Sequence, residues 1–334
     1  MMKLETLKIN KKRILEPKVL ITAGLTVLLI IGAIFLGKVF KEYYFWQETK
    51  DLYTAAMEDK TIDYSFLKPF RKWEVGDLED VDARSAITLA VNGTKKIVFE
   101  KNPQRILPIA SLTKIMTAYV ALKNYQLDDT IVITPKIVAT EEPTGYFRIG
   151  ETFTVEELLH SMLIESSNDA AVAISEIMGE EKFVAEMNRE AERMGLKHSY
   201  YIDPVGLDPD YENEPYNYST AQDIAQLVSE ILEESRDNPQ IAKLFEITRE
   251  KSYKINMSNG AFHHEAYTTN KILKEFPDMI GGKTGQTPNA KECFMVILPQ
   301  PKNKGYLVNV ILGSNNRFSE MKKIINWLNK AFVW

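Results

Sequence analysis

Two side chains in the segment PIASLTKIMTAYVAL, residues 108–122, have the types and spacing that nucleophilic catalysis needs. Ser111 and Lys114 are three positions apart, so on a helix they would lie on one face. A serine hydroxyl attacks well only when a base takes its proton, and a lysine can be that base if burial and neighbouring cations lower its pKa. The nearby residues are compatible with burial: Ile109, Leu112, Ile115 and Met116. Taken alone, the pair is equally typical of a solvent-exposed helix face.

A second polar cluster occurs in ESSNDAAVAI, where Ser166, Ser167 and Asn168 come directly before an alanine-rich stretch. Polar groups beside small, closely packing residues indicate a loop that is fixed against a core. The alternative is an ordinary helix N-cap, with Asn168 or Asp169 as the capping side chain.

A third cluster is GGKTG, residues 281–285. Lys283 offers a fixed positive charge, Thr284 offers a hydroxyl, and Gly285 leaves room for the backbone of a ligand to lie alongside. The alternative is a hairpin turn with an exposed lysine. Together, S-x-x-K, S-x-N and K-T-G in this order form the motif set of serine acyltransferases that act on D-alanyl peptides and β-lactams.

From about residue 83 to its end, the chain resembles the serine-type D-alanyl-D-alanine carboxypeptidases, the low-molecular-mass penicillin-binding proteins. Besides the motif set, four stretches are similar to that family: PIASLTKIMTAYV, SSNDAAVAI, YNYSTAQDIAQLV and MIGGKTGQT. The resemblance implies a β-lactamase/transpeptidase-like fold. It also implies hydrolysis of peptidoglycan stem peptides ending in D-Ala-D-Ala, and covalent inhibition by β-lactams.

The resemblance also implies roles in acyl transfer. Ser111 would attack the carbonyl of the penultimate D-alanine and become acylated, and Lys114 would take its proton. Ser166, beside Lys283, would relay a proton to the leaving amine. Water would then release the acyl group.

Other residues would bind the substrate. Asn168 would hydrogen-bond the substrate amide, and Thr284 with Lys283 would bind the terminal carboxylate. The backbone N–H groups of Ser111 and Gln286 would form the oxyanion hole, in which each donor is worth about 10²–10³ in rate. Arg317, in NNRF, matches an arginine that the family places near the pocket.

The chain departs from the family pattern at positions that bear on substrate details: Ser167 for the glycine of S-G-N, Asp203 for an asparagine in YIDPVGL, and Ala290-Lys291 for an A-G pair. Ser167 is expected to narrow or reorient its loop.

Related activities share these motifs. A class A β-lactamase needs a glutamate to activate the deacylating water, and residues 200–210 contain none. A DD-endopeptidase that cuts peptidoglycan crosslinks uses every motif and stays open. A catalytically inactive penicillin-binding module is disfavoured, because it would have no reason to keep both lysines.

Composition narrows the classes further. A net charge of −5 disfavours a nucleic-acid partner, and one cysteine, Cys293, excludes an internal disulfide and a cysteine metal cluster. FHHEAY does not match H-E-x-x-H, and adjacent histidines on a strand point to opposite sides. We therefore expect no metal and no cofactor, and an exposed loop at that segment; the histidines are His160, His198, His263 and His264.

The N-terminus predicts a membrane anchor. Residues 19–37 carry no charge, and as a helix at about 1.5 Å per residue they would span about 29 Å, near the thickness of a bilayer core. The basic residues before this run predict a cytoplasmic N-terminus and an extracytoplasmic catalytic domain in a bacterial cell membrane. A cleaved signal peptide is the alternative. Its apolar run would end in small residues, whereas the sequence here continues as FLGKVFKEYYFW, which is bulky and basic. Because the chain ends directly after the catalytic region, we expect anchoring through the N-terminus alone.

The elements that must position these residues predict an α+β fold, in which an antiparallel sheet is flanked by helices and accompanied by an all-helical subdomain. SAITLAVN and KKIVFEKN read as strands of a hairpin around Asn92-Gly93, and three more strands follow residue 279. Helices are expected over 154–178, 183–195, 219–235 and the C-terminal SEMKKIINWLNKAF, with a capping box at Thr154 and Glu157. The expected parts are a basic tail (1–18), the anchor (19–37), a juxtamembrane stalk (38–80) and a catalytic domain (81–334).

Overall fold

The computed structural model describes residues 32–41, 43–45, 47, 69–72, 74–209, 214–301 and 305–334 of the chain. The chain divides into two compact units, residues 1–64 and 65–334. In the first unit, residues 32–41 are helical. Over the described ranges, no helix has the length and apolar character needed to cross a membrane. The predicted tail, residues 19–31 of the predicted anchor and most of the predicted stalk lie outside those ranges.

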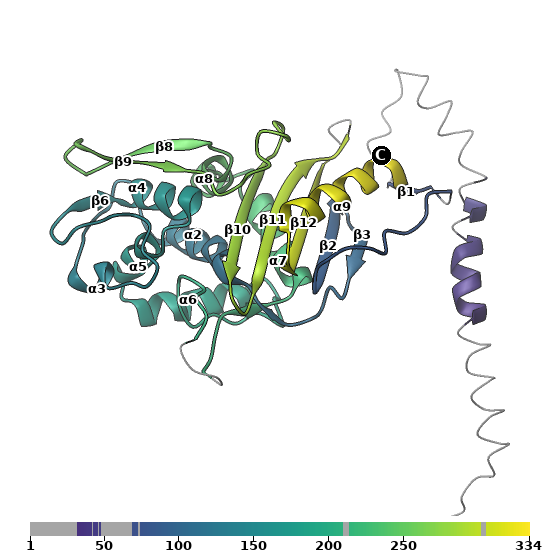
Figure 1. Ribbon diagram of the computed structural model, residues 1–334, viewed down its shortest axis with the longest axis horizontal. Helices are drawn as coiled ribbons and strands as arrows, with labels where there is room; N and C mark the ends of the chain where they lie inside the picture. Colours follow the sequence, from purple (N-terminus) through teal and green to yellow (C-terminus); the bar gives the residue numbers. More distant parts are fainter. Residues whose placement is uncertain are drawn as a thin grey trace, which may run out of the picture. The chain divides into compact units, whose positions relative to one another are not determined.

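The second unit is built on a five-stranded antiparallel sheet with the order β10-β11-β12-β2-β3 (Figure 1). The C-terminal strands return to the first hairpin, because β12 pairs with β2 along its length. This confirms the predicted α+β arrangement and the hairpin at residues 92–94. The bounds are β2 Ser85–Val91, β3 Lys95–Lys101, β10 Gly281–Thr287, β11 Lys291–Pro299 and β12 Tyr306–Ser314.

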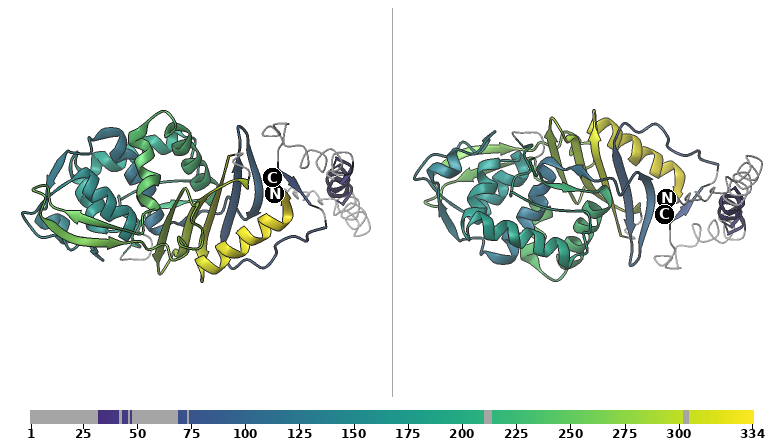
Figure 2. Two further views of the ribbon diagram at one scale, coloured as in Figure 1. Left: turned by 90° about the horizontal axis from the view of Figure 1, so that it is seen from above. Right: turned by 90° about the horizontal axis from the view of Figure 1, so that it is seen from below.

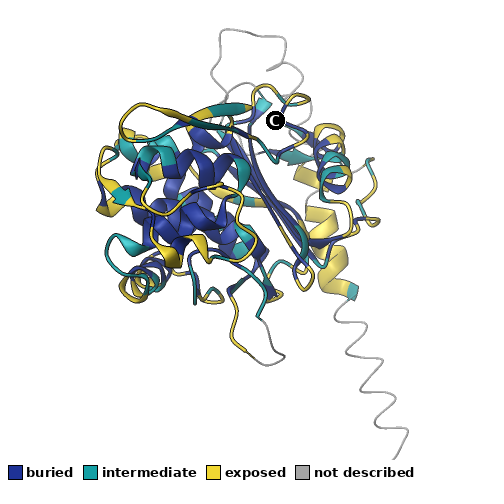
Figure 3. Ribbon diagram, turned by 60° about the vertical axis from the view of Figure 1, so that its left-hand side comes forward, coloured by how far each residue is buried: buried dark blue, intermediate teal, exposed yellow. Residues whose placement is uncertain are grey.

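Helices cover both faces of this sheet, which explains why β2 and β12 are buried at every position. Helix α9 (Arg317–Ala331) contacts β11 and β12, whereas α7 (Ala221–Glu234) contacts β2 and β12. Successive strand residues point to opposite faces, so Val308 and Val310 enter one hydrophobic core while Leu307 and Ile311 enter the other. Figure 2 shows the sheet between these helices, and Figure 3 shows that its central strands are buried.

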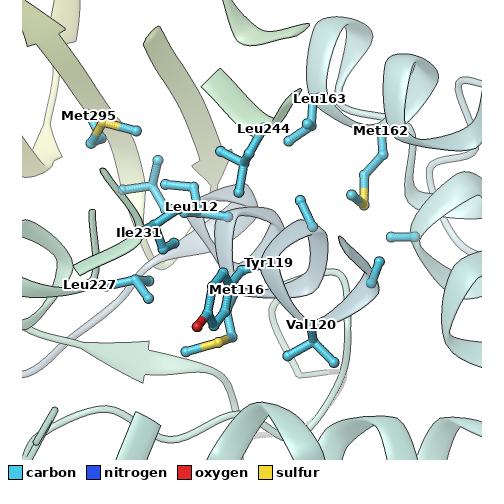
Figure 4. Packing of buried hydrophobic residues seen from close by; sticks show 14 of the residues in the cluster. Leu112, Met116, Tyr119, Val120, Met162, Leu163, Leu227, Ile231, Leu244 and Met295 are labelled. Atoms are coloured by element: carbon cyan, nitrogen blue, oxygen red, sulfur yellow. The ribbon is translucent and has the colours of Figure 1, made fainter. Parts of the chain in front are cut away.

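The all-helical part surrounds α2 (Thr113–Asn124), which is buried from Thr113 to Leu122. Figure 4 shows Met116 and Val120 of this helix, and Leu112 just before it, packed with side chains from distant parts of the chain. A helix enclosed on every side cannot shift without opening cavities, so its N-terminus is a rigid platform. Helices α5 (Asn168–Glu176), α6 (Glu180–Arg193), α7 and α8 (Pro239–Thr248) contact α2, whereas α3 (Pro135–Val138) and α4 (Val155–His160) pack against α5.

Helix ends follow the predicted signals in part. The Thr154 hydroxyl accepts from the Glu157 N–H at 3.2 Å, but the Glu157 carboxylate accepts from Asn256 N–H instead of completing a capping box. The predicted helix over 154–178 is interrupted by a π-helical turn, η2 (Ser161–Glu165), and by Ser166 in the left-handed region at φ 69°. This interruption matters because it turns the Ser166 side chain out of the helix.

Short strand pairs complete the unit: β1 (Phe70–Arg71) with β13 (Phe332–Val333), β4 (Leu107–Pro108) with β7 (Tyr218–Ser219), β5 (Thr130–Val132) with β6 (Thr152–Thr154), and β8 (Ser252–Asn256) with β9 (Phe262–Tyr267). The β1–β13 pair places part of the predicted stalk inside the folded unit.

The expected exposed loop at FHHEAY is wrong, because β9 is a strand whose histidines are mostly buried. The two rings do not diverge as adjacent strand side chains usually do: Nδ1 of His263 lies 2.7 Å from Nδ1 of His264. Within the described ranges, no group of three or more His, Cys, Asp or Glu side chains is arranged to hold a metal ion.

Candidate active site

Ser111 lies in a single 3₁₀ turn, η1 (Ala110–Leu112), that leads directly into α2. The turn is locked from two sides. A Cβ on Gly206, at φ +90°, would lie 2.2 Å from the Ala110 carbonyl oxygen, and a Cβ on Gly285 would lie 2.9 Å from the Ser111 nitrogen. Glycine is therefore required at both positions if the backbone around the serine is to keep its place.

Lys114 is completely buried beside this serine. Its Nζ lies 2.8 Å from Ser111 Oγ, 2.7 Å from Asn168 Oδ1 and 3.0 Å from the Val205 carbonyl oxygen. A neutral amine has two N–H donors and one lone pair, which suits two acceptors and one hydroxyl. Burial lowers the pKa of Lys114 from 10.5 to about 7, against the opposing charges of nearby carboxylates, Asp203, Asp169 and Glu142. The geometry therefore allows Lys114 to accept the serine proton near neutral pH.

Ser166 and Lys283 form the second hydroxyl–amine pair. Lys283 Nζ donates to Ser166 Oγ at 2.8 Å and to the Thr284 carbonyl oxygen at 2.9 Å. Burial, together with the charges of Lys114 and Arg317, lowers the pKa of Lys283 well below its ordinary value. The charge of Lys283 is therefore not fixed as the sequence suggested. A carboxylate bound beside it would raise its pKa again by attraction.

Asn168 joins Lys114 to a neighbouring loop. Its Oδ1 accepts from Lys114, and its Nδ2 donates to the backbone carbonyl oxygens of Glu141 at 3.0 Å and Glu142 at 3.2 Å. The predicted hydrogen bond from Asn168 to a substrate amide would replace one of these loop contacts.

Ser167, which replaces a glycine of the motif, caps α5 through a 3.0 Å bond from the Ala170 N–H. Its hydroxyl also donates to Asp169, whose Oδ1 accepts from Gly145 N–H at 3.0 Å. The N-cap is thus Ser167 rather than Asn168 or Asp169. The extra hydroxyl fixes the loop around Gly145 against α5.

The K-T-G strand β10 forms the opposite wall. Thr284 Oγ1 lies 2.6 Å from Thr269 Oγ1, and Arg317 Nη1 donates to the Gly285 carbonyl oxygen at 2.8 Å. Burial lowers the pKa of Arg317 as well, and its Nε has no hydrogen-bond partner among the described residues. The Gln286 side chain is exposed. These positions suit the binding of a carboxylate next to Thr284.

One hollow brings these walls together. Its lining contains every predicted site residue except the two lysines, which lie buried beneath it: Ser111, Ser166, Asn168, Thr284, Gly285, Gln286 and Arg317. Segments from η1, η2, α5, β10 and α9 therefore meet at one site.

Residues 72–316 match the D-alanyl-D-alanine carboxypeptidase family. The chain belongs to this family. It is 31% identical over 262 residues to the D-alanyl-D-alanine carboxypeptidase DacF of Bacillus subtilis, covering 75% of this chain and 62% of that protein. It is 30% identical over 270 residues to a D-alanyl-D-alanine endopeptidase of Pseudomonas aeruginosa, covering 76% of this chain and 80% of that one.

Solved structures agree with this assignment. The crystal structure of the Streptomyces K15 DD-transpeptidase is similar with a TM-score of 0.66 and 25% identity, covering 76% of this chain and all of that one. The family resemblance drawn from the three motifs is therefore confirmed, as is the penicillin-binding type of fold.

Several residues that line the site of this carboxypeptidase family member were not predicted from the sequence: Glu142, Thr144, Glu165, Gly206, Leu207, Thr269 and Thr287. Gly206 could have been found, because it is the glycine of YIDPVGL and only glycine fits its conformation. Glu142 belongs to no motif. A positive φ of 48° at this non-glycine residue marks its loop as special, but sequence does not report it.

Proposed function

We propose that this protein is a serine D-alanyl-D-alanine carboxypeptidase, which removes the terminal D-alanine from peptidoglycan stem peptides through an acyl-enzyme on Ser111. The observation that carries the proposal is the contact between Ser111 Oγ and the buried Nζ of Lys114 at 2.8 Å. The membership of the D-alanyl-D-alanine carboxypeptidase family supports the choice of substrate.

The proposed reaction has two halves. Lys114 takes the proton of Ser111 Oγ as this oxygen bonds to the carbonyl carbon of the penultimate D-alanine, and backbone N–H groups of Ser111 and Gln286 stabilise the oxyanion. The C–N bond then breaks as Ser166 passes its proton to the leaving amine of D-alanine and takes up the proton that Lys114 had accepted, which leaves Lys114 neutral again. In the second half, neutral Lys114 takes a proton from the water that attacks the ester carbonyl, and it passes this proton to Ser111 Oγ as the C–O bond of the ester breaks.

The terminal carboxylate of the substrate would lie next to Thr284, Lys283 and Arg317. The charge of this carboxylate would favour the protonated form of Lys283, whose Nζ donates a hydrogen bond to Ser166 Oγ. A β-lactam carries an equivalent carboxylate and an acylating carbonyl, so it would react with the same serine.

The assay is release of free D-alanine from diacetyl-L-Lys-D-Ala-D-Ala. Ser111→Ala and Lys114→Met should each lose about 10³-fold or more of kcat/KM, as expected when members of one catalytic unit are removed. Lys123→Met is the matched control, because this lysine lies on the same helix but pairs with Glu190 outside the hollow. No release by the wild type, or equal release by all variants, would contradict the proposal.

An endopeptidase activity is the second candidate, because the similar Pseudomonas aeruginosa protein is a D-alanyl-D-alanine endopeptidase. A purified crosslinked muropeptide dimer separates the two activities. We expect the monomeric pentapeptide to be cleaved faster than the dimer, and the reverse order would assign the protein to endopeptidases.

We further propose that residues 19–37 anchor the protein in the bacterial cell membrane, with the catalytic domain outside the cytoplasm. The support is the uncharged sequence and its flanking lysines, Lys18 and Lys38. The full chain should sediment with membranes until detergent is added. A chain lacking residues 1–38 should be soluble and keep its D-alanine release, and membrane association of the shortened chain would contradict this anchor.

A further inference from the structure

A second hollow adjoins the proposed active site. It is lined by Glu142, Gln286, Thr287, Pro288, Lys291, Glu292, Ser314 and Asn315. Three of these residues also line the first hollow, namely Glu142, Gln286 and Thr287. The two hollows are therefore neighbours along the second half of β10.

The proposed function fixes which part of the substrate passes into this second hollow. Strand β10 is at the edge of the sheet, so a substrate can lie along its free side as an added antiparallel strand. With the terminal carboxylate next to Thr284 and the scissile carbonyl at Ser111, the residues before the D-alanine pair must pass Gln286 and Thr287. The residue that precedes D-Ala-D-Ala is then beside Glu142.

The charged side chains of the second hollow differ in how they are engaged. Lys291 Nζ donates to Asn315 Oδ1 at 3.0 Å, and Glu292 Oε2 accepts from Arg317 N–H at 2.7 Å. The Glu142 carboxylate makes no hydrogen bond or ion pair with any residue that the structure describes. Of the two acidic residues that line this hollow, Glu142 is therefore the one whose carboxylate is available to bind a ligand.

The backbone that carries this carboxylate is held by the catalytic site itself. The Glu142 backbone carbonyl accepts from Asn168 Nδ2, and the next part of the loop is fixed through Gly145 and Asp169. A side chain on a fixed loop loses less entropy on binding than one on a free loop. The left-handed backbone at Glu142 is therefore a conformation that the site maintains.

We propose that Glu142 determines substrate specificity by binding an ammonium group on the residue that precedes D-Ala-D-Ala. The substrate class is a stem peptide whose third residue is a diamino acid with a free side-chain amine. A carboxylate and an ammonium form a charge-assisted hydrogen bond, and because Glu142 is exposed, salt should weaken this bond. This inference rests on the proposed carboxypeptidase function.

The test compares two peptides that differ only in this amine: Nα-acetyl-L-Lys-D-Ala-D-Ala and its Nα,Nε-diacetyl form. The wild type should cleave the free amine about five- to tenfold better in kcat/KM, and this ratio should shrink in high salt. Glu142→Gln should bring the ratio close to one. The ratio within each variant is the readout, so a general change in activity does not affect it.

Glu141→Gln is the matched control, because it removes the neighbouring carboxylate, which lines neither hollow. It should keep the wild-type ratio. Equal cleavage of both peptides by the wild type, or an unchanged ratio in Glu142→Gln, would overturn the inference alone. Cleavage of neither peptide would overturn the proposed function and the inference with it.

Discussion

Lys114 shows how burial produces a base from a residue that is normally a cation. The side chain is enclosed, and its amine contacts a hydroxyl, an amide oxygen and a backbone carbonyl oxygen. Carboxylates nearby limit the effect, because they favour the protonated form. The balance brings the pKa of Lys114 to about 7, where it can both accept and return a proton.

This pKa predicts the pH dependence of acylation. Below pH 7 the amine is protonated and cannot take the serine proton, so the acylation rate should fall about tenfold per pH unit. Above pH 7 it should level off. Stopped-flow measurement of acylation by a chromogenic β-lactam gives this fall of the rate below pH 7 directly.

Asp203→Asn provides the matched variant. The asparagine oxygen can still accept from the Val205 and Gly206 N–H groups, which now lie 2.6 Å from Asp203 Oδ1. The variant removes a negative charge that raises the pKa of Lys114. The pH below which the acylation rate falls should therefore be lower in the variant. A rate that is flat from pH 5 to 9, or a shift to higher pH in Asp203→Asn, would contradict the role of Lys114.

At this scale, sequence predicted the residues that belong to linear motifs. Ser111, Lys114, Ser166, Asn168, Lys283 and Thr284 could be named because their spacing is fixed by the elements that carry them. Glu142 could not, since its importance comes from a loop that crosses the site from elsewhere in the chain. The environment of Lys283 could not be predicted either, because three buried or half-buried cations meet there only after folding.

At the scale of elements, the site depends on close approaches between backbones. The segment after Asp203 presses Gly206 against η1, and β10 presses Gly285 against the same turn. These contacts join two segments far apart in sequence to the turn that carries the nucleophile. They leave the serine backbone no room to move.

Gly206→Ala should therefore damage both stability and activity. Its Cβ would meet the Ala110 carbonyl oxygen at 2.2 Å, in a left-handed conformation that L residues avoid. We expect a loss of about 2–5 kcal/mol in the free energy of unfolding, from conformational strain plus overpacking. Urea unfolding and β-lactam acylation rates measure the two effects.

Gly195→Ala is the control that has the backbone strain of a positive φ without the steric clash. Gly195 also has a positive φ, +70°, but a Cβ added to it would have no neighbour within 4 Å among the described residues. The substitution should cost about 1–2 kcal/mol and leave acylation unchanged. Equal effects of the two substitutions would show that the contact with η1 is unimportant.

Helices and strands with a clear hydrophobic pattern were predicted well, whereas irregularities within helices and strands were not. The C-terminal helix follows from an amphipathic pattern, and strands β11 and β12 follow from apolar runs. The π turn before Ser166 has no pattern, because its residues are as helical in composition as those of α4. The contact between His263 and His264 was also missed, since the pairing of β8 with β9 shifts register at His263 and the strand alternation is interrupted there.

At the scale of the whole molecule, two hydrophobic cores share one sheet, and the second core includes residues before β2. Val75 and Leu78 pack against the cluster formed by α9 and the sheet. The Trp327 indole donates to the Gly76 carbonyl oxygen at 2.9 Å, and the Arg71 guanidinium lies 4.8 Å from the centre of its ring. The folded unit therefore includes residues that come before the predicted start at residue 81.

Two shortened chains test this boundary. A chain of residues 65–334 should unfold cooperatively and react with β-lactams. A chain of residues 81–334 loses the β1–β13 pair and the contacts of Val75 and Leu78, so it should be less stable by about 2–4 kcal/mol. Equal unfolding midpoints in urea would contradict the proposed contribution of residues 70–80.

The α+β arrangement could be predicted, because strand patterns stand at both ends of the catalytic region around a helical middle. The boundary could not, because β1 has two residues and its pairing with β13 depends on where the chain end lies after folding. Short edge pairs carry little hydrophobic signal of their own.

The central claim is that Ser111 is the nucleophile and that buried, neutral Lys114 activates it. The most direct measurement is intact-protein and peptide mass spectrometry after brief exposure to benzylpenicillin at pH 8. The account predicts one penicilloyl adduct per chain, located on Ser111, with none on Ser111→Ala and a much slower reaction of Lys114→Met. An adduct on another residue, or undiminished labelling of Ser111→Ala, would contradict it.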